Sequence, residues 1–216
     1  MDERVAAEEH LRVIRSLMER ATVYRAISAP TALLGGGLSV LTTGLLLAAR
    51  RGESFLALTY PGAARHFITV WLAVLALTLL ANTFLIWRKA QREQSAFFTS
   101  GLRLALASAL PALLIAAVLT ALFCRDDETA ESLGALVTVW VTCYGLALLA
   151  TANFAPPSLR YLGWAFLLTG IACTLLMGRL FNSDPARNAI IAMALTFGAY
   201  HLIYGVACWP RKTDGA

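Results

Sequence analysis

Charged residues are scarce in this sequence, and acidic ones are missing from every long apolar stretch. Asp, Glu, Lys and Arg make up 14 % of the 216 residues, against about 25 % in soluble domains. All 13 Asp and Glu residues lie outside the apolar runs. The runs therefore contain no carboxylate pair for acid–base catalysis and no carboxylate of the kind that proton-coupled transporters use.

Motifs of the common enzyme classes are also missing. The sequence has no HExxH zinc motif and no phosphate-binding G-x-x-x-x-G-K-[ST] loop. Its four cysteines form no CxxC pair and belong to four different apolar runs, which predicts that they pack as small apolar residues. We therefore expect no metal, no cofactor and no catalytic group. The cysteines are Cys124, Cys143, Cys173 and Cys208.

Six long apolar runs, separated by short polar connections, dominate what is present. A bilayer core about 30 Å thick needs about 20 apolar residues in a helix to cross it, and 58 % of this chain is hydrophobic. The runs lack the period-two alternation of a barrel strand. We predict an all-α polytopic transmembrane helix bundle, preceded by an amphipathic helix at 1–30 and followed by a short tail at 209–216. The predicted spans are 31–49, 67–87, 104–123, 133–152, 161–180 and 188–208.

The distribution of Lys and Arg predicts the orientation of the bundle. With the N-terminus inside, the inner segments hold 12 of these residues and the outer segments 6. Because cytoplasmic connections carry an excess of Lys and Arg, we expect both termini in the cytoplasm. The basic residues flank the runs instead of forming one groove, so we expect the lipid bilayer, and no nucleic acid, as their partner.

The segment before the first span has an apolar face. Residues spaced alternately by four and three positions align on one side of a helix. This face fits an amphipathic helix on the inner membrane surface, a docking helix for a partner or a second copy through residues 1–26, or a charged tail with no role. The face consists of Ala7, Leu11, Ile14, Met18 and Ala21.

The same segment carries a family resemblance. Residues 10–28 have the sequence HLRVIRSLMERATVYRAIS. This stretch resembles the opening of a group of uncharacterised bacterial membrane proteins, in which an I-R-x-M-E-R-like helix leads through a serine into a glycine-rich first span. The resemblance covers roughly the first 45 residues. It implies a six-span protein of the bacterial inner membrane and no particular activity.

Polar residues of four spans fall at similar depth. At 1.5 Å per residue they lie roughly 6 to 13 Å from the predicted cytoplasmic ends. One interpretation is a small polar pocket open to the cytoplasm, and the other is hydrogen bonding between helices. The candidate pocket residues are Ser39, Asn82, Tyr144, Tyr200, His201 and Tyr204.

Rows of small residues predict close helix packing. Gly35, Ser39 and Thr43 are spaced by four positions on the first span. Such rows let helix backbones approach one another, within one chain or between two copies. A second row, on the third span, consists of Ser108, Ala112, Ala116 and Thr120.

Three functions follow from these features. The first is a non-enzymatic subunit or regulatory partner of a membrane assembly, which acts through the N-terminal helix. The second is a small transporter or channel that dimerises to build a pathway for a small molecule. The third is an intramembrane enzyme, for which His201 is the best single candidate because ionisable residues in a membrane interior usually have a role.

Overall fold

The computed structural model describes residues 8–13, 29–51, 63–94, 100–124, 132–152, 156–181 and 184–209. Within these ranges 93 % of the residues are helical and none lies in a strand. Six helices are long and apolar enough to cross a membrane, which confirms the predicted all-α bundle. They are α2 (Ala29–Arg51), α3 (Ala63–Glu93), α4 (Ser100–Phe123), α5 (Leu133–Ala150), α6 (Pro157–Leu175) and a final span formed by α8 (Pro185–Met193), the π-helix η2 (Ala194–Tyr200) and α9 (His201–Ala207).

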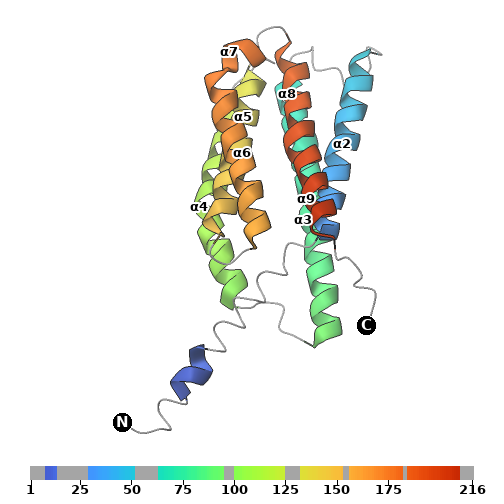
Figure 1. Ribbon diagram of the computed structural model, residues 1–216. Coiled ribbons are helices and arrows are strands. Elements are labelled where there is room, and N and C mark those ends of the chain that lie inside the picture. The colour runs from blue at the N-terminus through green and yellow to red at the C-terminus, as the bar shows by residue number, and fades with distance from the viewer. Residues whose placement is uncertain are drawn as a thin grey trace.

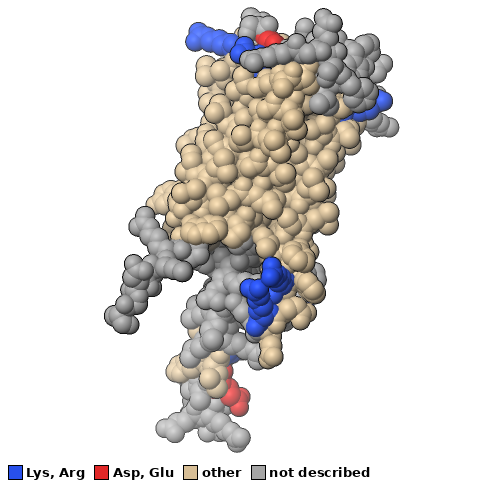
Figure 2. All heavy atoms as spheres, turned by 90° about the vertical axis from the view of Figure 1, so that its right-hand side faces the viewer, with Lys and Arg blue, Asp and Glu red and all other residues tan. Residues whose placement is uncertain are grey.

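The helices run up and down, so that α2 begins and α9 ends at the same end of the bundle (Figure 1). We call this the inner end, after the orientation that the basic residues predict, and the opposite end the outer end. On the face shown in Figure 2, Lys and Arg lie near the two ends and a band without charge lies between them. This band is the part that a bilayer would surround.

Several boundaries differ from the predicted spans. The fifth span, predicted over 161–180, is interrupted at Leu176, where α6 ends and the short helix α7 (Met177–Leu180) follows. The second helix continues to Glu93, past the predicted end at 87, because nothing in its charged last turns breaks a helix. Pro157 begins α6, a position where its missing N–H is not needed. Of the predicted helix at 1–30, residues 8–13 are helical and 14–28 lie outside the described residues.

The helices form two halves of the bundle. Helix α2 packs against α3, η2 and α9, and helix α5 packs against α4 and α6. We call α2, α3 and the final span the first half, and α4, α5 and α6 the second half. Figure 1 shows the two halves beside each other. They meet mainly where α5 contacts α8, with smaller contacts between α6 and η2 and between α3 and α4.

Glycines bring the helix backbones together inside each half. A side-chain carbon at Gly145 would lie 2.6 Å from the backbone nitrogen of Leu167 on α6. In the first half, a side-chain carbon at Gly36 would lie 2.9 Å from the backbone oxygen of Gly198 on η2. Gly35, in the predicted small-residue row, lies against the side chain of Thr78 on α3. That row therefore serves packing within one chain.

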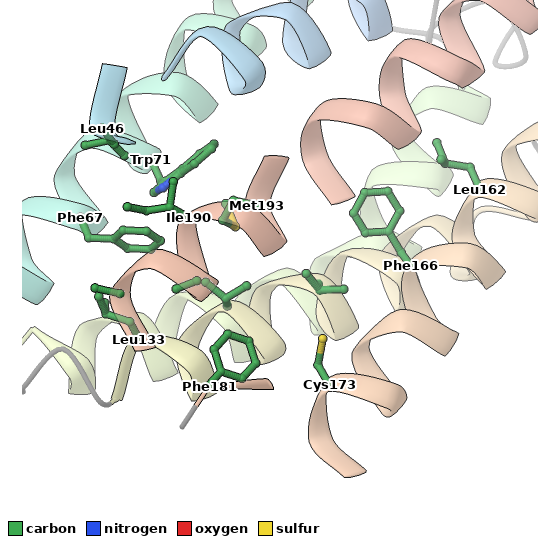
Figure 3. Packing of buried hydrophobic residues seen from close by; sticks show 14 of the residues in the cluster. Leu46, Phe67, Trp71, Leu133, Leu162, Phe166, Cys173, Phe181, Ile190 and Met193 are labelled. Atoms are coloured by element: carbon green, nitrogen blue, oxygen red, sulfur yellow. The ribbon is translucent and has the colours of Figure 1, made fainter. Parts of the chain in front are cut away.

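The apolar core joins the two halves at the outer end. Leu46, Trp71, Ile190 and Met193 lie together between α2, α3 and α8 (Figure 3). Val137 of α5, also in this cluster, has no exposed surface. Across the halves, the rings of Phe67 on α3 and Trp140 on α5 stack with centroids 6.1 Å apart. The outer join is therefore largely apolar.

Replacement of Gly145 by alanine should destabilise the bundle. The added methyl group would press on the backbone of α6, which cannot move like a side chain, so we expect a loss of about 1 to 3 kcal/mol. The measurement is the free energy of unfolding in a detergent titration. Gly44→Ala is the matched control, because a carbon there meets nothing within 4 Å. Equal stability of the two variants would contradict the close approach of α5 and α6.

Candidate functional site

A cluster of rings and hydroxyl groups joins the two halves toward the inner end. The second half contributes side chains from α5 and α6, and the first half contributes side chains from η2 and the first residue of α9. Positions 197, 200 and 201 share one helix face because residues three and four apart are neighbours on a helix. We call the group the seam cluster: Tyr144, Phe166, Thr169, Phe197, Tyr200 and His201.

Phe166 lies at the centre of the seam cluster and has no exposed surface. Its ring centroid is 4.8 Å from that of Tyr144, 5.1 Å from that of Phe197 and 5.4 Å from that of Tyr200. All three pairs meet edge to face, an arrangement that the quadrupoles of aromatic rings favour. Ring contacts therefore supply most of the cohesion of this join.

A hydrogen bond between Tyr144 and His201 crosses the seam. The Tyr144 hydroxyl lies 2.8 Å from Nε2 of His201. The buried Nδ1 of His201 makes no well-aligned hydrogen bond, but the backbone carbonyls of Thr196 and Phe197 are close to the ring. These acceptors favour the tautomer with its proton on Nδ1, so Nε2 accepts from Tyr144. A charged imidazole would be costly at this depth, and the pair therefore links the halves as neutral groups.

A second side-chain hydrogen bond also crosses the seam. The hydroxyl oxygens of Thr169 and Tyr200 are 2.8 Å apart. Thr169 also donates to the carbonyl of Ala165, at 2.8 Å. Because a threonine hydroxyl has one proton, Thr169 accepts from Tyr200. The seam is thus held by two side-chain hydrogen bonds that each have a donor on one half and an acceptor on the other.

The structure brings together three of the predicted pocket residues, Tyr144, Tyr200 and His201. Tyr204 is buried one turn further along and is near enough to Tyr144 to interact electrostatically. Ser39 instead donates to the carbonyl of Gly35 on its own helix, at 2.9 Å. Asn82, on the contact between α2 and α3, accepts a hydrogen bond from Thr31 at 2.9 Å. That these residues line a pocket stays a prediction.

The sequence alone did not identify several members of the seam cluster as candidate residues. Phe166 and Phe197 are apolar residues in apolar runs, so nothing distinguished them from lipid-facing side chains. Their depth, close to that of Tyr144 and Tyr200, was the available signal. The π-helix at Ala194–Tyr200 was also unexpected. Such segments are rare and frequently occur at functional sites.

The described ranges contain no candidate metal site and no disulfide. No three His, Cys, Asp or Glu side chains gather there. All four cysteines are free, and Cys143 and Cys173 are buried. Both of these lie on the interior faces of α5 and α6.

No family model, curated protein or solved structure matches this chain.

A double-mutant cycle should measure the bond that crosses the seam. Tyr144→Phe removes the hydroxyl and His201→Phe removes the acceptor. Hydrogen bonds between membrane helices contribute about 0.6 kcal/mol on average and up to about 1.7 kcal/mol, so we expect a coupling energy in this range. The measurement is the free energy of unfolding of the two single variants and the double variant. Tyr161→Phe, at an exposed position of α6, should change stability little; a coupling energy of zero would contradict the bond.

Proposed function

We propose that this integral membrane protein is a non-enzymatic subunit or regulatory partner of an assembly in the bacterial inner membrane. Both termini lie in the cytoplasm in this proposal. The N-terminal helix binds the partner, which is another protein or a second copy of the chain. The docking face is the one that the sequence predicts, and it includes Leu11.

The exposure of apolar side chains near the N-terminus carries this proposal. Residues 8–13 form a helical segment in which every residue is exposed. Leu11, the one residue of the docking face in this segment, is 65 % exposed. Apolar side chains on a helix outside the membrane band gain free energy when another surface covers them. The remaining residues of the face, Ala7, Ile14, Met18 and Ala21, lie outside the described residues.

The internal hydrogen bonds of the bundle also support a structural role. Trp140 donates to Thr120 between α5 and α4, at 2.8 Å, and Tyr144 pairs with His201. Ser39, which an intramembrane Ser/His enzyme would pair with His201, is bonded to its own helix instead. The observations therefore favour a scaffold over a catalytic centre.

A dimeric carrier or channel for a small molecule is the second candidate. The observation in its favour is the division of the bundle into two halves that meet through the seam cluster. Movement of such halves against each other is the usual basis of alternating access.

A substitution at Leu11 should release the partner. Leu11→Glu places a charge on the apolar face, and native mass spectrometry of protein extracted gently from its own membrane should then show loss of a stoichiometric protein adduct. We expect affinity to fall at least about tenfold, because the loss of one buried leucine side chain is worth about 1.5 to 3 kcal/mol.

Glu9→Gln is the control for this experiment. Position 9 is about 200° around the helix from position 11, so the substitution should leave the adduct intact. An adduct that survives in Leu11→Glu, or that is absent from the unsubstituted protein, would contradict the docking role.

A further inference from the structure

The close glycine contacts of the described helices lie inside the two halves of the bundle and not at the join between them. In the described ranges, each glycine that lies against a neighbouring helix does so within one half. Gly163 and Gly170 face α5 from α6, and Gly205 faces Leu33 of α2 from α9. Such contacts involve or adjoin backbone atoms, which cannot give way by a change of rotamer. Each half is therefore built to move as a unit.

The seam between the halves changes in character along its length. At the outer end, Val137 and Ile190 are completely buried in the apolar core. Toward the inner end the contacts are aromatic rings and the side-chain hydrogen bonds from Tyr144 and Tyr200. Hydrogen bonds between side chains can be exchanged for hydrogen bonds with water or a ligand, whereas the apolar side chains of Val137 and Ile190 have no hydrogen bonds to exchange.

We propose that the inner part of the seam opens while the outer part acts as the pivot, and that the opened seam binds an uncharged, flat molecule with hydrogen-bonding groups. Opening breaks the bonds Tyr144–His201 and Thr169–Tyr200, and leaves both glycine-packed halves intact. The π-helix lies at this point of the final span, next to His201. This binding site goes beyond the partner-docking role and does not depend on it.

The chemistry of the seam cluster selects the class of ligand. Hydroxyl groups and an imidazole offer donors and acceptors, and the rings of Phe166 and Phe197 offer flat apolar faces that favour another ring. In the described parts of the spans, no Asp, Glu, Lys or Arg lies at this depth. A charged ligand would lose its hydration without gaining a counter-ion, and is therefore excluded.

Cysteine labelling with N-ethylmaleimide tests the opening, because this reagent is itself an uncharged flat ring with two carbonyl acceptors. The four native cysteines are replaced by alanine in the full chain, and Thr169→Cys is compared with Val137→Cys at the outer part of the seam. We expect N-ethylmaleimide to alkylate position 169 at least about tenfold faster than position 137. The reaction is carried out in native membranes, and its rate is measured by intact-mass spectrometry. Equal rates at the two positions would overturn the proposal.

Two further comparisons complete the test. Leu168→Cys, on the exposed face of α6, reports reaction with reagent dissolved in lipid and should also be slower than position 169. A sulfonated maleimide, with rates normalised to glutathione, should label position 169 much more slowly than N-ethylmaleimide; similar normalised rates would overturn the uncharged ligand class. Tyr200→Cys is the second reporter if Thr169→Cys does not fold. Failure of these tests leaves the result at Leu11 unaffected, so the two proposals are distinguishable.

Discussion

Hydrocarbon offers no hydrogen-bond partner to a polar group, and this constraint decides where the polar side chains of the bundle lie. Threonine hydroxyl groups find this partner within their own helix. Thr138 donates to the carbonyl of Gly134 and Thr196 donates to that of Ala192, each one turn earlier in the helix. Groups that cannot reach their own backbone pair across helices, as Tyr144 does with His201. The same constraint forces the backbone into helices, so the fold and the seam cluster have one physical origin.

Attraction between the helices needs a different source, because lipid tails are as apolar as leucine. Close packing supplies it. Gly145 and Gly36 let backbones approach within each half, and the buried contact around Val137 holds the halves together at the outer end. At the inner seam the halves are joined by the rings around Phe166 and by two side-chain hydrogen bonds. In the two proposals above, the closely packed halves provide a stable platform for a docking helix, and the inner seam provides a place for a small ligand.

The spans could be predicted from the sequence, because a run of about 20 apolar residues has few alternatives to a transmembrane helix. Their ends were harder: only Gly178, two residues further on, lies near the interruption at Leu176, and the π-helix has no sequence signature. The depth calculation placed Tyr144, Tyr200 and His201 correctly at one level. It failed to separate them from Asn82, because depth along a helix gives no information about which side of the bundle a residue faces.

The sequence by itself determined the six helices, the charge-free band and the depth of each polar residue, because composition and the rise of a helix act locally. Only the tertiary structure decided which helices form each half, which polar residues meet and which bond to their own backbone. That choice depends on how each helix is rotated about its axis. Contacts such as those of Gly198 with Gly36 and of Phe166 with Phe197 set this rotation, and they join residues too distant in the chain for any local pattern to pair.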